Sequence, residues 1–270
     1  VTSPALLMPR TLDCEFVRVL DALRGARAAI FDAYGVAGSF GCWDYLSPWV
    51  NVVFALPELV GAGAELPPAT VLVGPSIYPD REDESAAFPW ERLDGRPLVY
   101  ASFGTVWYCQ PDLFRMIAEA AASLDVQLVL TLGALAGTDY ARTLPGDPIG
   151  LPYTPQLRVL ERAAVCISHG GANTVMESLY YGVPLFVIPL CTDQPVNGFF
   201  VERAGAGVSI LPAKVTTEAC RRALAALLPG DSPYRTTARR IQAAYRKRDG
   251  AREAARRIVE VLGRRERATV

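Results

Sequence analysis

The sequence predicts an α/β fold: a doubly wound parallel sheet with helices on both faces, accompanied by a small and incomplete amino-terminal α/β segment. Two observations support this prediction. From about residue 97 onward, short runs that are apolar throughout alternate with amphipathic segments of helical period. Strands that lack a polar face are buried on both sides, as in a parallel sheet covered by helices. Of the 270 residues 51% are apolar, which is enough for a sizeable core.

The carboxyl-terminal part of the chain carries the clearest pattern. We expect its strands at 97–103, 126–132, 163–168, 184–190 and 207–211. The helices are expected from Pro111 to about Leu124, from Asn173 to Tyr181, and through Asn197 and Arg203 to near Gly205. Three further helices are expected at about 216–228, 232–248 and 250–264.

The first 78 residues are less regular. A helix is expected at 15–23 and strands at 51–59 and 69–75. These elements are too few for a second complete doubly wound domain. A charged stretch at 79–85 predicts a linker between the two parts.

Charge and cysteine content exclude several classes of function. The formal net charge of −1 provides no general attraction to nucleic acid or to an anionic membrane. Arginines concentrate near the carboxyl end, which we interpret as a solvated helix face rather than a patch for an anionic partner. The six cysteines are scattered, without zinc-ligand or disulfide spacing, and Cys166 and Cys191 are expected to be buried. Reduced thiols, with neither a signal peptide nor a membrane-spanning run in the sequence, favour a cytoplasmic protein.

The most informative residue is His169, the only histidine in the chain. It stands between a predicted strand and a predicted helix and is followed by Gly170 and Gly171. A helix amino terminus offers free N–H groups and a positive dipole end, and glycines allow an anion to approach the backbone closely. The motif therefore predicts a phosphate site at the carboxyl end of a strand. The alternative is a plain strand–helix turn capped by Asn173.

Neighbouring polar residues favour the phosphate site. Glu177 follows Asn173 by one helical turn, where a carboxylate can accept hydroxyls of a ribose; the alternative is an exposed helix charge. Asp193 and Gln194 follow another strand and suit sugar hydroxyls. Their alternative role is to cap the next helix, which has Pro195 in its first turn. The stretch 102–105, SFGT, forms a further loop at a strand end.

Six motifs in register carry a resemblance to a known family: VGPS (73–76), SFGT (102–105), YTPQ (153–156), HGGANTVMES (169–178), YYGVPLFVIP (180–189) and DQPVNG (193–198). Over about residues 51–264 the chain resembles the carboxyl-terminal half of two-domain GT-B nucleotide-sugar glycosyltransferases. It is most similar to the bacterial macrolide-type branch of the UDP-glycosyltransferase superfamily. The resemblance implies inverting, metal-independent transfer from a UDP- or TDP-sugar to a hydroxyl of a small natural product, without a cofactor. It also implies a role in secondary metabolism such as antibiotic biosynthesis.

The resemblance also implies a role for individual residues of the donor site. Tyr153 would stack on the base and Gln156 would lie near the ribose, which Glu177 binds. His169, Asn173 and Thr174 would bind the diphosphate. Asp193 and Gln194 would contact the donor sugar. The donor site expected in this way comprises Ser102, Gly104, Thr105, Tyr153, Thr154, Gln156, His169, Gly170, Gly171, Asn173, Thr174, Glu177, Asp193 and Gln194.

The resemblance divides the chain into four parts. Residues 1–78 correspond to a remnant of the amino-terminal acceptor domain, 79–96 to a linker and 97–248 to the donor-binding domain. Residues 249–270 correspond to a carboxyl-terminal helix that can return to the amino-terminal part. An incomplete amino-terminal part would leave a strand edge for self-association or for a partner chain.

The catalytic histidine that this family carries in its amino-terminal domain has no counterpart here, because the one histidine lies in the donor motif. The carboxylates available in its place belong to no recognised motif: Asp13, Glu15, Asp32 and Asp44. We therefore expect nucleotide-sugar binding but little transfer by this chain alone. Three interpretations stay open: the donor-binding half of a truncated or split transferase, a non-catalytic helper acting through a partner chain, and a related epimerase.

Overall fold

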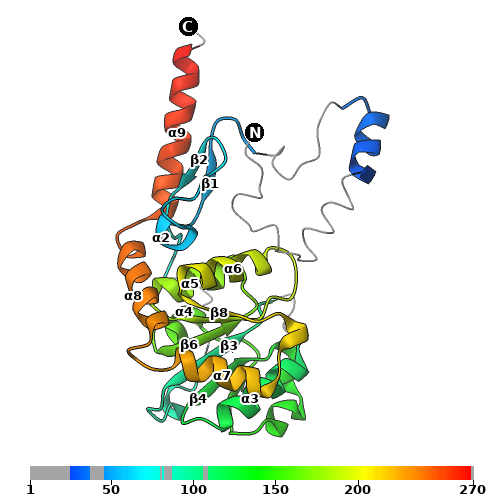
Figure 1. Ribbon diagram of the computed structural model, residues 1–270, viewed down its shortest axis with the longest axis vertical. Helices are drawn as coiled ribbons and strands as arrows, with labels where there is room; N and C mark the ends of the chain where they lie inside the picture. The colour runs from blue at the N-terminus through cyan, green and yellow to red at the C-terminus, as the bar shows by residue number, and fades with distance from the viewer. Residues whose placement is uncertain (1–24, 37–45, 80, 82–86, 106–108, 269–270) are drawn as a thin grey trace.

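The computed structural model describes residues 25–36, 46–79, 81, 87–105 and 109–268, with side chains as far as residue 264. Its main feature is a sheet of six parallel strands in the order β5-β4-β3-β6-β7-β8 (Figure 1). The bounds of these strands are β3 Leu98–Ser102, β4 Gln127–Thr131, β5 Ile149–Leu151, β6 Ala163–Ser168, β7 Leu185–Val187 and β8 Gly207–Ser209. The order reverses between β3 and β6, as in a doubly wound sheet, so the predicted fold class is confirmed.

Helices cover both faces of this sheet (Figure 1). Alternate residues of β3 divide the core: Val99 and Ala101 pack with α3 and α7, whereas Leu98 and Tyr100 belong to the opposite face. On that face the core is completed by α4, α5, α6 and α8. The bounds are α3 Pro111–Ala122, α4 Gln156–Leu160, α5 Ala172–Tyr180, α6 Gln194–Ala204, α7 Thr217–Leu227, α8 Pro233–Tyr245 and α9 Gly250–Ala268.

Helix ends lie where local chemistry predicts them. The hydroxyls of Thr216 and Ser232 accept hydrogen bonds from the first turns of α7 and α8. Gly205 ends α6 in the left-handed region, with φ of 74°, which a residue with a side chain rarely adopts. Short 3₁₀ helices occupy Trp90–Arg92, Gly133–Gly137, Asp139–Thr143 and Pro212–Lys214.

A second, two-stranded parallel sheet precedes the main one in sequence. It pairs β1 (Asn51–Val53) with β2 (Thr70–Leu72), and α2 (Pro57–Val60) lies between them in the chain. The expected strand at 51–59 is therefore wrong beyond Val53, because Pro57 begins a helix there. The chain after β2 meets the start of α9, where the N–H of Gly250 donates to the carbonyl of Pro75 at 2.8 Å. From this point α9 extends away from the six-stranded sheet (Figure 1).

Several other expectations need correction. The prediction at 184–190 overstates β7, which ends at Val187, and sequence periodicity missed the short elements β5 and α4. Cys166 is buried as expected, but Cys191 is only half-buried because it lies in the loop beyond β7. The expected helix at 15–23 lies outside the described residues. Within the described part of the chain, no helix is both long enough and apolar enough to cross a membrane.

Candidate functional site

The candidate site lies at the carboxyl ends of β3 and β6, where the strand order reverses. Ser102 and Ser168 are register partners and end the two strands. Each serine hydroxyl accepts a hydrogen bond from the N–H two residues later, at Gly104 (3.4 Å) and Gly170 (3.0 Å). Both glycines have positive φ, 77° and 83°, so each loop turns away sharply from its strand. The loops after β3 and β6 diverge at this point and leave a crevice between them. Open α/β sheets bind their ligands in such a crevice.

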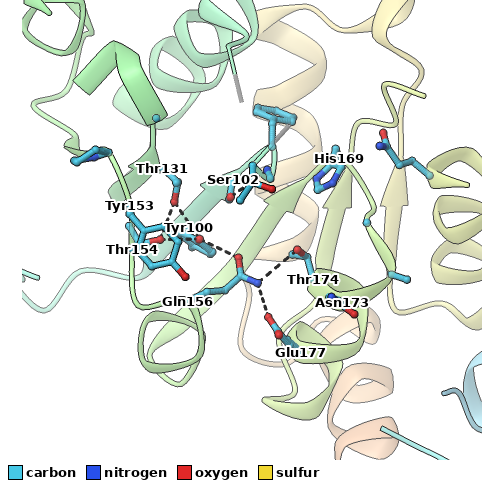
Figure 2. Close-up of a pocket in the computed structure, with 18 of the residues that line it drawn as sticks. Tyr100, Ser102, Thr131, Tyr153, Thr154, Gln156, His169, Asn173, Thr174 and Glu177 are labelled. Carbon is cyan, nitrogen blue, oxygen red and sulfur yellow. Dashed lines mark hydrogen bonds between the residues drawn. The ribbon is translucent and has the colours of Figure 1, made fainter. Parts of the chain in front are cut away.

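A cavity of about 880 Å³ fills this crevice. All of the expected donor-site residues line it except Gly170 and Asp193. Residues from the strand ends, the loops and the linker complete its wall: Arg81, Tyr100, Phe103, Thr131, Gly133, Ala134, Pro152, Ala172 and Thr192. Figure 2 shows the labelled side chains converging on this space from the strand ends and from α5.

The ring of His169 lies between the two glycine loops. A Cβ atom added at Gly104 would lie 2.9 Å from its Cε1 atom, and one added at Gly171 would lie 2.7 Å from its Nε2 atom. Burial lowers the pKa of His169 below its ordinary value, although the carbonyl of Ser102 and the charge of Asp193 act in the opposite direction. Burial therefore favours the neutral imidazole, which has one N–H to donate and one nitrogen that accepts.

The amino terminus of α5 opens onto the cavity. Gly171 is its N-cap residue and no side chain caps the helix, so Asn173 does not perform the capping role considered as the alternative. The first-turn N–H groups have no intrahelical acceptor. Asn173 and Thr174 line the cavity in the same turn. Together with the neutral His169, this end of the helix has the chemistry of an anion site.

One turn further along α5, Glu177 is only 3% exposed, which excludes the alternative of an ordinary solvated helix charge. Its Oε1 accepts from Nη1 of Arg81 at 2.6 Å, across 96 residues of sequence. Its Oε2 accepts from the side-chain amide of Gln156 (Figure 2). A buried carboxylate needs such partners, and the ion pair with Arg81 supplies the compensating charge. The sequence offered no indication that the linker contributes this arginine.

Behind Gln156, sequence reasoning also missed Tyr100 and Thr131. The hydroxyl of Tyr100 lies 3.1 Å from Thr131 Oγ1 and 2.8 Å from Thr154 Oγ1, and it donates to Oε1 of Gln156 at 3.1 Å (Figure 2). Tyr100 stands within a strand that is otherwise apolar, so its pattern indicated only core packing. Thr131 could have been predicted from its position, because it is a polar residue at the carboxyl end of β4.

Polar contacts within their own loop hold Asp193 and Gln194. Oε1 of Gln194 accepts the backbone N–H groups of Leu190 (2.8 Å) and Cys191 (3.0 Å). Asp193 occupies the N-cap position of α6 but forms no capping bond with its side chain. Its Oδ2 accepts instead from Asn197 at 2.8 Å, and Asn197 also donates to the carbonyl of Gly170 at 2.9 Å. Asn197 thus links the loop after β7 to the glycine loop after β6.

Other candidate groups lie outside the cavity. Asp32, considered as a base, is exposed at the end of a helical stretch, and Asp13, Glu15 and Asp44 lie outside the described residues. Within the ranges that the structure describes, no cluster of three or more His, Cys, Asp or Glu side chains is placed to hold a metal ion.

The chain is similar to known proteins in sequence and in fold. Residues 115–261 match the family described as "Erythromycin biosynthesis protein CIII-like, C-terminal domain". The chain is 31% identical over 192 residues to the uncharacterized UDP-glucosyltransferase YojK of Bacillus subtilis (strain 168), an alignment that covers 71% of this chain and 47% of YojK. It therefore spans about half the length of the curated relatives it matches.

Solved structures show the same architecture. The glycotransferase of kitacinnamycin superposes with a TM-score of 0.73 at 26% identity, over 91% of this chain and 66% of that one. The calicheamicin glycosyltransferase CalG4 superposes with a TM-score of 0.69 at 25% identity, over 97% of this chain and 63% of that one.

Proposed function

Since this chain belongs to the UDP-glycosyltransferase superfamily, we propose that its cavity is the donor site of a glycosyltransferase and binds a UDP- or TDP-sugar. One observation carries the proposal. The cavity joins an uncapped helix amino terminus and a neutral histidine, which suit a diphosphate, to a buried carboxylate one helical turn away, which suits a ribose. Asn173 and Glu177 are about 6 Å apart along the helix axis, a spacing that fits neighbouring parts of one nucleotide.

The diphosphate would accept hydrogen bonds from the first-turn N–H groups of α5 and from His169. The sequence beside this motif has no pair of acidic residues of the kind that binds a metal ion. We therefore propose that the helix dipole and neutral hydrogen-bond donors stabilise the charge of the diphosphate. Tyr153, which is 39% exposed and lines the cavity, offers an aromatic face for the base. The donor sugar would then lie toward Asp193 and Gln194, in the loop that Asn197 ties to Gly170.

The proposed reaction is transfer with inversion to a small hydroxylated acceptor. The acceptor oxygen bonds to the anomeric carbon, the bond from that carbon to the diphosphate breaks, and the acceptor loses its proton to a base. The groups at the start of α5 would stabilise the charge on the departing nucleoside diphosphate. Because the only histidine of these 270 residues lies in the donor cavity, we propose that transfer by this chain alone is slow.

Thermal unfolding with added nucleotide tests donor binding directly. UDP or TDP should raise the melting temperature in a concentration-dependent way, since a ligand at 100 times its Kd stabilises the folded state by about 2.7 kcal/mol. Uridine and inorganic pyrophosphate, tested separately, should stabilise less. A melting temperature that neither UDP nor TDP changes at millimolar concentration would contradict the proposal.

Calorimetry on His169→Ala tests the position of the diphosphate. Loss of one hydrogen bond to phosphate should weaken UDP binding by roughly 1–3 kcal/mol. Asn51→Ala is the control, because Asn51 also makes side-chain hydrogen bonds, to Ser47, but lies outside the cavity. Equal UDP affinity in wild type and His169→Ala would show that the diphosphate binds elsewhere.

A transfer assay tests the reaction itself. The isolated chain is incubated with UDP-glucose and with panels of phenolic and macrolide acceptors, and glycosylated products are measured. We expect nucleotide binding with little product. Robust turnover would refute the proposal that transfer by this chain alone is slow, and it would place a competent base among these residues.

A further inference from the structure

A group of buried hydroxyls belongs to the wall of the donor cavity. Tyr100, on β3, is 1% exposed, and Thr131 and Thr154 are also buried. The threonine Oγ1 atoms lie 2.7 Å apart, and the phenol oxygen of Tyr100 lies within 3.1 Å of both. Gln156 joins this group to the cavity, because its Oε1 accepts from Tyr100 at 3.1 Å. Figure 2 shows the group leading from the strand ends to α5.

The directions of the hydrogen bonds made by Gln156 and Tyr100 follow from Glu177. An ionised carboxylate only accepts, so the Gln156 side chain must direct its NH₂ group toward Glu177 and its carbonyl oxygen toward Tyr100. The single phenol proton of Tyr100 is then used on Gln156. Thr131 and Thr154 must therefore donate to Tyr100 or to each other. From Tyr100 onward the hydrogen bonds run one way, from Tyr100 to Gln156 and from Gln156 to Glu177.

This chain of donors holds the carboxylate in place. One Glu177 oxygen accepts from Gln156 and the other from Arg81, so neither can turn without losing a bond. Gln156 is fixed in the same way, between Tyr100 on one side and Glu177 on the other, with Thr174 Oγ1 at 3.5 Å from its Nε2. Burial raises the pKa of Tyr100 to about 12, so the phenol keeps its proton at every ordinary pH.

We propose that Tyr100 is a positioning residue for nucleotide binding: by orienting the amide of Gln156, it fixes Glu177 in the direction that accepts the hydroxyls of the donor ribose. This inference rests on the proposed function, in which Glu177 contacts the ribose. Tyr100 acts through Gln156, because its phenol O–H holds the carbonyl end of the amide whose NH₂ group bonds Glu177. A phenylalanine would fill the same volume in the sheet, so the hydroxyl serves the hydrogen-bond chain rather than packing.

The test compares two nucleotides in the variant Tyr100→Phe. Calorimetry measures Kd for UDP and for 2′,3′-dideoxyuridine diphosphate, which lacks both ribose hydroxyls. We expect wild type to prefer UDP, and Tyr100→Phe to weaken UDP binding about three- to tenfold, the effect of one hydrogen bond. Binding of the dideoxy compound should not change. In a Gln156→Ala background, Tyr100→Phe should have no further effect, because the two residues act in series.

Tyr245→Phe is the matched control. Tyr245 is also fully buried, but its hydroxyl has no hydrogen-bond partner among the described residues, and it lies on α8, away from the cavity. The variant Tyr245→Phe should bind both nucleotides with the same affinity as wild type. If Tyr100→Phe yields no folded protein, Thr131→Val tests the same chain of donors and should reduce the preference for UDP in the same direction.

The outcomes separate the two proposals. An unchanged ratio of the two Kd values in Tyr100→Phe would overturn the inference. If both nucleotides bind more weakly by the same factor, the hydroxyl has a purely structural role. If wild type binds UDP but does not prefer it over the dideoxy compound, Glu177 does not bind the ribose hydroxyls. That result would overturn the inference but leave the proposal of donor binding intact. A wild-type protein that binds neither UDP nor TDP would refute the proposed function itself.

Discussion

Gly171→Ala tests whether the position of the His169 ring controls nucleotide binding. Gly171 has φ of −59° and ψ of 138°, which alanine adopts without strain, so the backbone tolerates the change. The new Cβ would lie 2.7 Å from Nε2 of His169, whereas ordinary contacts begin near 3.4 Å. The ring must therefore retreat by about 0.7 Å.

The size of the effect follows from this displacement. A hydrogen bond from His169 to phosphate at about 2.9 Å would lengthen to about 3.6 Å, beyond the hydrogen-bonding range. Loss of that bond costs about 1–3 kcal/mol, or about 5- to 150-fold in Kd for UDP. Gly171→Ala should therefore weaken binding about as much as His169→Ala, and the double variant should be no weaker than either single one.

Calorimetric titration with UDP is the assay, because alanine at an N-cap position also costs up to about 1 kcal/mol of stability that is unrelated to binding. Gly230→Ala is the control, since a Cβ there would meet no atom within 4 Å and the residue has no positive φ. Wild-type affinity in Gly171→Ala, or additive losses in the double variant with His169→Ala, would refute the reasoning.

Two further predictions concern pH and charge. Burial lowers the pKa of His169, so the unfolded chain binds a proton at this histidine more readily than the folded chain does. The free energy of unfolding is therefore unaffected by His169 above about pH 6.5 and decreases as the pH falls below that value. In urea unfolding without ligand, the free energy of unfolding of His169→Gln should decrease less at low pH than that of wild type. The comparison isolates one group, because the chain has a single histidine. Parallel pH profiles of the two proteins would contradict this prediction. Arg81→Ala should lower the free energy of unfolding by roughly 1–2 kcal/mol, less than for a fully buried pair, because the side chain of Arg81 is 30% exposed. Arg142→Ala, which breaks an exposed pair with Asp139, should cost under about 1 kcal/mol, and equal losses would contradict the distinction.

The sequence predicted the parts of this protein whose pattern is local. Residues 163–168 form a strand with the predicted bounds, because a short, largely apolar run that ends at a glycine turn favours a buried strand. The predicted helix ends near Tyr181 and Gly205 were also correct to within about one residue, because each is followed or formed by a glycine with positive φ, at Gly182 and Gly205. Short elements failed: β5 has three residues and α4 has five, too few for a periodic pattern to be recognised.

The features of the candidate site also differ in how far the sequence could predict them. A histidine followed by two glycines, placed between strand and helix, was visible in sequence, because strand, turn and helix are consecutive. The hydrogen-bond partners of Glu177 were not. Arg81 reaches it from 96 residues away, and Gln156 from 21. Contacts of this kind depend on where separate loops lie relative to one another, and no local pattern specifies that.

Sequence alone thus determined the parallel sheet, the turn at His169 and the family to which the motifs belong. The tertiary structure decided what surrounds that turn. It converted Glu177 from a possible surface charge into a buried carboxylate, and it placed the hydroxyl of Tyr100, from a largely apolar strand, where it donates to Gln156. The physical reason is that local periodicity reports which face of an element is buried, whereas the partners of a buried polar group are set by strand order and register, which brought β3, β4 and β6 together.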